Sequence, residues 1–192
     1  IDTLDCEVKL KADELSKVRL KTLKGIVVSF NDFLKQLYLR PARINLVKEE
    51  LNAYGQDKVE IELNNTALDK VSAGEFNRLR LALLAVKSLQ DTQGGILMLD
   101  EIDANLSGEE SMSVAKVLSH LSKHYQIFVI SHQPQLTSQA DQHFFVQRDI
   151  YSSVKVLKKE ERVSEIARMI SGDKVTHEAI EFARGLMAEK CV

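Results

Sequence analysis

Residues 96–101 read Ile-Leu-Met-Leu-Asp-Glu, an unbroken apolar run that ends in two carboxylates. A second apolar run, Ile-Phe-Val-Ile at 127–130, is followed by Ser131 and His132. Short apolar runs of this kind are typical of parallel strands that are covered on both faces. The helical stretch at 107–123 between them is long enough to be the crossover that parallel strands require. These residues predict a parallel pair of strands whose polar residues meet at one edge of a sheet.

The same alternation continues on both sides of this pair. A further strand is expected at 143–147, and helices are expected at 74–90, near Gln135, at 159–170 and at 176–188. Strands that alternate with helices indicate crossover connections. The sequence therefore predicts an α/β fold in which a mostly parallel sheet is flanked by helices.

The first 40 residues follow a helical pattern instead. Apolar residues between 13 and 39 recur at steps of three and four and form one stripe, namely Leu23, Ile26, Phe30, Phe33 and Leu37. The stripe is about two heptads long, whereas a sustained coiled coil requires about three or four. An amphipathic helix packed on a core and the end of a coiled-coil arm therefore remain alternatives. Pro41 is expected to end the helix.

Two short strands are expected directly after this helix. Residues 59–63 read Val-Glu-Ile-Glu-Leu, and this alternation is typical of a half-exposed strand. A strand at 43–47 precedes it, and Asn-Ala-Tyr-Gly at 52–55 is typical of a turn. We therefore expect a short β-hairpin, and we divide the chain into a helix at 1–40 and a lobe at 41–192.

The charge of the chain gives no overall attraction to a polyanion, because 26 basic and 28 acidic side chains leave a net charge of −2. Contact with DNA therefore requires a local patch. A basic run consists of Lys155, Lys158, Lys159 and Arg162. Such a run is typical both of a solvated helix start and of a surface that contacts phosphates.

Other features of the sequence bear on location. Cys6 and Cys191 lie near opposite ends and show no metal-binding spacing, which favours a reducing cytoplasm. No apolar stretch approaches the roughly 20 residues that span a bilayer, and residues 1–3 resemble no secretory signal. The absence of an initiator Met indicates that the chain is part of a longer protein.

The strand ends provide the first candidate site. Ligands of open α/β sheets bind at the carboxyl edge of the strands, where Asp100, Glu101 and His132 are expected. In the simpler alternative, the acids only end a strand and the histidine is structural. In the functional alternative, Asp100 holds a nucleotide-bound Mg²⁺, Glu101 orients or deprotonates the attacking water, and His132 stabilises charge on a phosphoryl group.

The start of the helix at 74–90 is the second candidate site. Ser72 and Glu75 fit a capping box, and the same spacing recurs at Ser107 and Glu110. A helix amino terminus preceded by Ser and Gly is also a ready anion site, because its free N–H groups and the positive end of the helix dipole face a phosphate. Capping and phosphate binding can alternate, so both interpretations stay open.

Two rival metal patterns are incomplete. The loop that starts at Asp103 resembles the first half of an EF-hand, but Val114 stands where the twelfth position requires Glu. His120 and His124 lie one helical turn apart, but Leu121 occupies the place of the catalytic Glu of a zinc protease. Neither pattern predicts a metal site.

The order of these segments resembles the second half of an ABC-type ATPase head. In that family, residues 72–75 are the signature motif, the strand that ends at Asp100 and Glu101 is the Walker B strand, Asp103 lies in the D-loop and His132 is the switch histidine. Residues 131–136, 142–146 and 161–172 are similar to the RecN family of bacterial DNA-repair proteins. That family is related to the structural-maintenance-of-chromosomes (SMC) proteins. The resemblance covers most of the chain, from about residue 13 to residue 187.

The resemblance implies an ATPase that uses ATP and Mg²⁺, in which Asp100 is the metal ligand and Glu101 and His132 are catalytic. It assigns cofactor binding to Ser72, Ala73, Gly74, Glu75 and Asp103. The signature segment of such a head caps the ATP of a second head, so that ATP joins two heads and hydrolysis releases them. The implied role is DNA double-strand-break repair and recombination in the bacterial cytoplasm, associated with the nucleoid. The implied partners are an amino-terminal Walker A lobe, a second copy of the head, and DNA.

Three features depart from the family pattern. Ala73 replaces the usual Gly of the signature, and the D-loop reads Asp-Ala-Asn-Leu at 103–106. None of the eight glycines belongs to a GxxxxGK[ST] loop, which cradles phosphates in the family. We therefore expect the chain alone to be inactive. The alternatives are another SMC-like or ABC-type ATPase lobe without a DNA role, and a non-catalytic interaction module.

Overall fold

The computed structural model describes residues 2–90, 94–100, 102–103, 106–148 and 150–189. The chain forms two compact units, Ile1–Gln90 and Asp91–Val192. The predicted α/β class is confirmed by the helices and strands of these units. The boundary that we placed near residue 40 lies inside the first unit, and the assignment of 1–40 as a separate domain stays a prediction.

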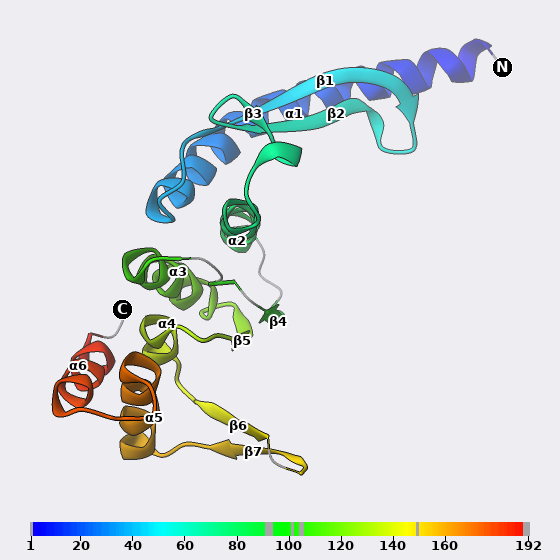
Figure 1. The fold of residues 1–192 in the computed structure, drawn as a ribbon. Coiled ribbons are helices and arrows are strands. Elements are labelled where there is room, and N and C mark those ends of the chain that lie inside the picture. The colour runs from blue at the N-terminus through cyan, green and yellow to red at the C-terminus, as the bar shows by residue number, and fades with distance from the viewer. Residues whose placement is uncertain (1, 91–93, 101, 104–105, 149, 190–192) are drawn as a thin grey trace. The chain divides into compact units, whose positions relative to one another are not determined.

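The first unit joins a long helix to a hairpin and a second helix. Its elements are α1 (Asp2–Gln36), β1 (Ala42–Asn52), β2 (Gly55–Leu63), β3 (Thr66–Ala67), a 3-10 turn at Leu68–Lys70, and α2 (Ala73–Ser88). In Figure 1, β1 and β2 run along α1. The helix α1 contacts both strands and also α2.

The two ends of α1 have different environments. Phe30, Leu34 and Leu37 are fully buried near its carboxyl end, where burial contributes about 1.5 to 3 kcal/mol for each side chain. Towards the amino terminus, Leu4 is 66% exposed and Val18 is 61% exposed. The packed-helix interpretation is therefore confirmed for the carboxyl end, and a coiled-coil arm at the other end stays a prediction. Neither α1 nor any other helix in the described part of the chain is long and apolar enough to cross a membrane.

The end of α1 differs from the predicted one. The helix ends at Gln36, before the predicted Leu39, because Tyr38 adopts a left-handed conformation with a φ of 55°. The N–H of Leu39 then donates to the carbonyl of Leu34 at 2.8 Å, which closes the last turn. Pro41 follows after the helix has already ended, so it was not the cause of the helix end.

The predicted hairpin is confirmed, with strands longer than expected. Two polar contacts fix it to α1: the Asn31 side chain pairs with the backbone of Ala42 at 2.8 and 3.1 Å, and Ser16 donates to the Asp57 carboxylate at 2.8 Å. Gly55 has a φ of 107°, and a Cβ there would lie 3.0 Å from the Arg19 guanidinium. The positive φ of this turn therefore favours glycine, which has no Cβ to strain there.

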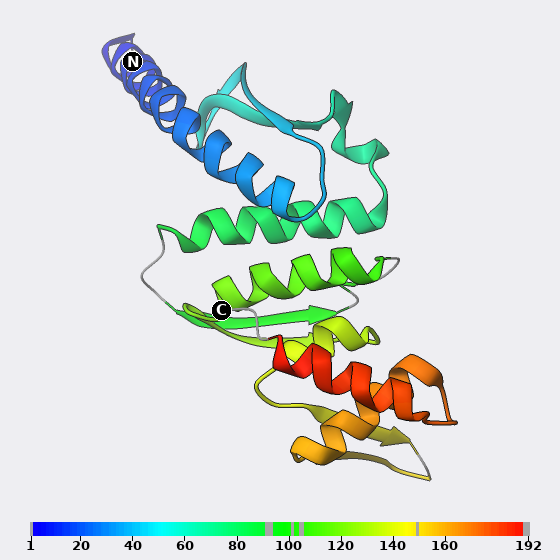
Figure 2. The same cartoon turned by 90° about the vertical axis from the view of Figure 1, so that its left-hand side faces the viewer.

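The second unit contains the predicted parallel strands. Its elements are β4 (Gly95–Asp100), α3 (Gly108–Leu121), β5 (Tyr125–Ile130), α4 (Pro134–Gln139), β6 (Phe144–Arg148), β7 (Ser152–Val156), α5 (Lys159–Ser171) and α6 (His177–Ala188). The strands β4 and β5 are parallel, from Gly95 opposite Tyr125 to Asp100 opposite Ile130. The helix α3 makes the crossover and lies along one face of the pair (Figure 2).

The expectation that β4 and β5 are covered on both faces is wrong within this chain. Leu97, Leu99, Ile127 and Val129 alternate along one face and are half-buried. The residues of the opposite face are exposed, namely Ile96 (65%), Met98 (81%), Phe128 (42%) and Ile130 (67%). The sequence pattern reports the apolarity of both faces, but only one of them has a covering layer in the described residues.

The strand predicted at 143–147 does not pair in the expected way. As β6 it pairs antiparallel with β7, a strand that the sequence analysis did not predict. The helices α4, α5 and α6 contact one another beside this pair. The core between α5 and α6 consists of Val163, Ile166, Ala167, Ala179, Ala183 and Leu186. Parallel pairing is therefore found between β4 and β5, and the other strand pairs of the described residues are antiparallel.

Candidate functional site

Asp100 and His132 lie at the same edge of the β4–β5 pair. Asp100 is the last residue of β4 and is opposite Ile130, the last residue of β5. Because the two strands run in the same direction and end in register, the residues that follow them emerge at one carboxyl edge. Asp100 is exposed, and the His132 side chain is 69% exposed. Both side chains are therefore accessible to a ligand at this edge.

Glu101, which follows Asp100, lies outside the described residues. The shared edge is therefore found for Asp100 and His132, and the chemical roles of all three residues stay predictions. No group of three or more His, Cys, Asp and Glu side chains that could hold a metal ion occurs in the described ranges. A single exposed carboxylate still fits Mg²⁺ at a phosphoryl-transfer site, because that ion takes one or two carboxylates together with phosphates and water.

Asp103 is fully buried and is turned towards the loop that follows β5. Its Oδ2 accepts a hydrogen bond from the hydroxyl of Ser131, and that hydroxyl oxygen accepts the N–H of Gln133 at 3.0 Å. Its Oδ1 lies 4.0 Å from Nδ1 of His132. The nucleotide contact that the resemblance implies for Asp103 stays a prediction. The contacts that Asp103 makes are with the segment that carries His132.

Residues 72–75, which the family resemblance matches to the signature motif and which we call the signature segment, form the predicted capping box at the start of α2. The N–H of Glu75 donates to Ser72 Oγ at 3.2 Å, and the N–H of Ser72 donates to a carboxylate oxygen of Glu75 at 3.0 Å. Ala73 and Gly74 are the first two residues of the helix. The structure thus confirms the capping interpretation, and binding of a phosphate by these residues stays a prediction.

The capping box makes the start of α2 sensitive to pH. The hydrogen bonds from Ser72 hold the pKa of Glu75 below its usual value. A lowered carboxylate pKa means that the stabilisation is present above the pKa of the unfolded chain, about 4.3, and is lost as the pH falls through the lower folded value. We therefore expect Glu75→Gln to weaken the first turn of α2 by about 0.5 kcal/mol at pH 7. Below the lowered pKa, the wild type and this variant should no longer differ.

Hydrogen exchange of the amides in the first turn of α2 tests this expectation. It is measured at pH 7 and again at a pH below the lowered pKa of Glu75. The matched control is Glu109→Gln, since Glu109 is an exposed acid in the first turn of α3 but does not close its capping box. A Glu75→Gln difference that persists unchanged at low pH would contradict the assigned cause.

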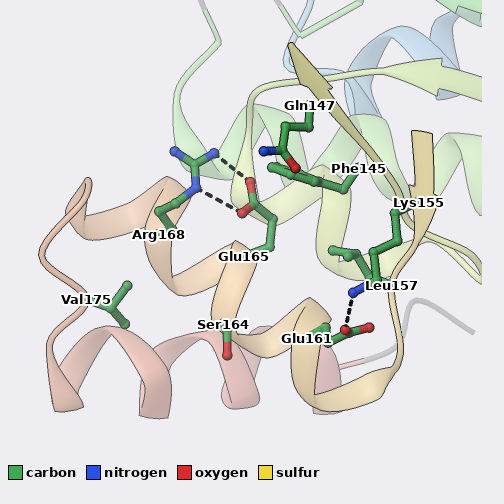
Figure 3. A pocket seen from close by; sticks show the side chains of 9 residues that line it. All are labelled: Phe145, Gln147, Lys155, Leu157, Glu161, Ser164, Glu165, Arg168 and Val175. Carbon is green, nitrogen blue, oxygen red and sulfur yellow. Dashed lines mark hydrogen bonds and ion pairs between the residues drawn. The ribbon is translucent and has the colours of Figure 1, made fainter. Parts of the chain in front are cut away.

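A groove in the second unit lies away from the ends of β4 and β5. It measures about 430 Å³ and is lined by the β6–β7 pair and α5 (Figure 3). Figure 3 shows two ion pairs in it, Lys155 with Glu161 and Arg168 with Glu165. These ion pairs compensate the charges of the groove, and none of the predicted site residues lines it. It therefore adds nothing to the candidate site.

Two of the four residues of the basic run, Lys155 and Arg162, are engaged in internal contacts. The Arg162 guanidinium donates to the carbonyl of Ala140 at 2.6 Å and to that of Asp141 at 3.2 Å, after the end of α4. Lys155 pairs with Glu161. These contacts favour the structural interpretation of the run over contact with DNA.

Ser131 is the residue of this site that sequence reasoning missed. It was quoted as part of a motif but received no role. Its hydroxyl accepts the N–H of the residue two positions later, Gln133, which is a local turn that serine commonly forms. The position directly before His132 was the one available signal, and only the structure shows that Asp103 is the other partner.

Comparison with known proteins extends these observations. No family model matches the chain. The DNA repair protein RecN of Helicobacter pylori strain J99 is 41% identical over 187 residues, which cover 96% of this chain and 36% of that protein. RecN of Aquifex aeolicus is 35% identical over 169 residues, which cover 81% of this chain and 32% of that protein. The chain thus spans about a third of the length of the curated relatives that it matches.

Solved structures that are similar to this chain include SMC heads. The Smc head domain with a coiled coil and joint from Pyrococcus yayanosii has a TM-score of 0.60, 24% identity, and coverage of 80% of this chain and 31% of that chain. An SMC ATPase studied for ATP-driven dimerization has a TM-score of 0.56, 23% identity, and coverage of 82% and 98%. The chain therefore matches the carboxy-terminal region of RecN proteins, and it has the fold of an SMC-type ATPase head.

Proposed function

We propose that this chain is the carboxy-terminal lobe of an SMC-like ATPase head that acts in the repair of DNA double-strand breaks and in recombination. The observation that carries the proposal is the placement of Asp100 and His132 at one carboxyl edge of a parallel strand pair, in a chain that matches RecN proteins over 96% of its length. The relatives are named for DNA repair, and the solved neighbours are SMC heads.

The open face of the β4–β5 pair supports a two-lobed head. Ile96, Met98, Phe128 and Ile130 form an apolar surface that water covers in the isolated chain. Surfaces of this kind mark contacts with other protein. The matched relatives are about three times as long as this chain, so a full-length protein of that size would have enough further sequence to supply a covering lobe. We propose that this lobe carries the Walker A loop that the printed sequence lacks.

In the proposed hydrolysis of ATP, three residues at the carboxyl edge of β4 and β5 have different roles. Asp100 would hold Mg²⁺ directly or through water, and the bound ion would supply neutralisation of the phosphate charge. Glu101 orients or deprotonates the attacking water, and His132 places an N–H donor at the γ-phosphate, where negative charge develops. Such fixed donors are effective because they are already oriented before the reaction begins.

We propose that the signature segment acts on a second copy of the head. The start of α2 presents backbone N–H groups and the positive end of the helix dipole, and Ser72 and Gly74 would cap the ATP held by the other head. ATP then joins two heads and its hydrolysis separates them. In a bacterial cell this cycle would capture or tether DNA in the cytoplasm, in association with the nucleoid.

The experiment that tests this function compares the full-length protein with the present chain. We expect Mg²⁺-ATP to convert the full-length protein into a dimer, measured by light scattering, and to be hydrolysed by it. We expect no turnover by the chain alone, so strong hydrolysis by the isolated chain would contradict the proposal.

Binding of the full-length protein to DNA should weaken as salt increases, because phosphate neutralisation releases counterions. An SMC-like ATPase without a DNA role would lack this binding.

A further inference from the structure

The loop after β4 and the loop after β5 are joined by side chains rather than by strand pairing. Ser131 donates from its hydroxyl to Asp103 and accepts from the N–H of Gln133 at 3.0 Å. The Gln133 side chain in turn donates to the carbonyl of Leu106 at 3.4 Å. The segment around His132 is therefore attached at two points to the loop that follows the Walker B strand.

One carboxylate oxygen of Asp103 accepts no hydrogen bond from the described residues. The side chain is 0% exposed, and its Oδ1 has no hydrogen-bond partner among the described residues. A buried carboxylate oxygen without a donor is costly, and native structures rarely leave one unexplained. Nδ1 of His132 lies 4.0 Å from this oxygen, which is longer than a hydrogen bond. Because the imidazole is largely exposed, it can turn and close this gap.

We propose that Asp103 and Ser131 are positioning residues for His132, an inference that rests on the proposed ATPase function. Ser131 fixes the Asp103 carboxylate through Oδ2, and Oδ1 then accepts the Nδ1–H of His132. The ring is held with Nε2 on the side away from Asp103, towards the strand edge. A ring held between a carboxylate and a phosphate donates from both nitrogens, since each anion accepts one N–H.

In other proteins, a hydrogen bond to one ring nitrogen of a histidine orients the other nitrogen towards its ligand. A carboxylate that accepts one ring N–H fixes both the ring plane and the position of the other nitrogen. Loss of the carboxylate or of the serine that holds it leaves His132 present but poorly oriented. The expected defect is therefore in turnover rather than in ATP binding, because misplacement affects the transition state more than the bound nucleotide.

The test uses four variants of the full-length protein: Ser131→Ala, Ser131→Thr, Asp103→Ala, and the double variant with both alanines. We expect Ser131→Ala to lower kcat about tenfold and to change the KM for ATP by less than about threefold. Ser131→Thr keeps the hydroxyl and should restore most of the turnover. The double variant should be no slower than the slower single variant, because both changes break the same contact.

The matched control is Ser113→Ala, since Ser113 is a buried serine whose hydroxyl donates to a local backbone carbonyl, that of Glu110, within α3. This control should leave kcat unchanged. The proposal is overturned if Ser131→Ala turns over like the wild type, if Ser131→Thr is as slow as Ser131→Ala, or if the two alanine effects multiply. Denaturant unfolding of the same variants should also show non-additive Ser131 and Asp103 effects, and additive effects would rule out the contact even without hydrolysis data. A wild-type protein that hydrolyses no ATP would instead reject the proposed function.

Discussion

Asp100→Ala in the full-length protein is expected to abolish the Mg²⁺-ATP-dependent association of heads and to lower ATP turnover about 100-fold or more. A bound metal ion contributes several kcal/mol of charge stabilisation at a transferring phosphoryl group, and about 1.4 kcal/mol corresponds to a tenfold change in rate. Asp100 ends β4 at an exposed position, so its replacement removes a ligand without opening a cavity in the core. Light scattering with and without Mg²⁺-ATP measures the association directly.

The matched control for this variant is Asp173→Ala, since Asp173 is an exposed acid in the turn after α5. It should dimerise and hydrolyse ATP like the wild type. Thermal unfolding of both variants should remain close to that of the wild type, which separates loss of the metal from loss of the fold. Full ATP-dependent association of Asp100→Ala would remove this residue from its assigned role and favour a non-catalytic interaction module.

Glu101→Gln is expected to have the opposite effect on association. The amide keeps the size of the side chain but cannot accept a proton from the attacking water, so hydrolysis should fall about 100-fold or more. The metal ligand Asp100 and the signature segment remain, so ATP should still join the heads. We therefore expect an ATP-bound dimer that persists for the duration of a size-exclusion run, whereas the wild type returns to monomers as its ATP is used.

The control for this variant is Glu109→Gln, which replaces an exposed acid in the first turn of α3. It should show wild-type hydrolysis and no trapped dimer. An unchanged hydrolysis rate in Glu101→Gln would show that another group activates the water. The opposite behaviour of the Asp100 and Glu101 variants is the most specific signature of the proposed mechanism, because a merely structural pair of acids would weaken association in both cases.

The strand-and-helix order of the second unit could be predicted because its signals are local. The apolar runs that became β4 and β5 contrast with the amphipathic stretch that became α3, and the capping box of Ser107 and Glu110 marks the start of α3 in the sequence. The strand β7 was not predicted, because Ser-Ser-Val-Lys-Val has few of the large apolar or aromatic residues that indicate a strand. The strand β7 forms by pairing with β6 across a turn. The strand propensity of its own residues does not indicate that such a partner is available.

The helix α1 shows a second limit of sequence reasoning. A helix was predicted at 1–40, but its apolar stripe was placed only from about residue 13, because Leu4 and Val18 are exposed and do not continue the buried stripe. Its end was assigned to Pro41, although the left-handed Tyr38 closes the helix first. Aromatic residues rarely adopt this conformation, so residue type gave no signal for it.

The candidate site was predictable in its position but not in its contacts. Parallel strands of equal length bring Asp100 and His132 to one edge, and that follows from sequence order alone. The burial of Asp103 and its bond to Ser131 could not be predicted, since they depend on how two loops 28 residues apart pack together. Similarly, apolarity alone predicted two covered faces for β4 and β5, although one of them is open in this chain.

The most direct test of the central claim is a structure of the full-length Glu101→Gln protein with bound Mg²⁺ and ATP. We predict that the Asp100 carboxylate binds the metal directly or through one water, and that His132 donates to the γ-phosphate at about 2.7 to 3.2 Å. Ser72 of a second copy should lie against the same nucleotide. A nucleotide bound away from the carboxyl edge of β4 and β5, with Asp100 and His132 both facing solvent, would contradict the claim.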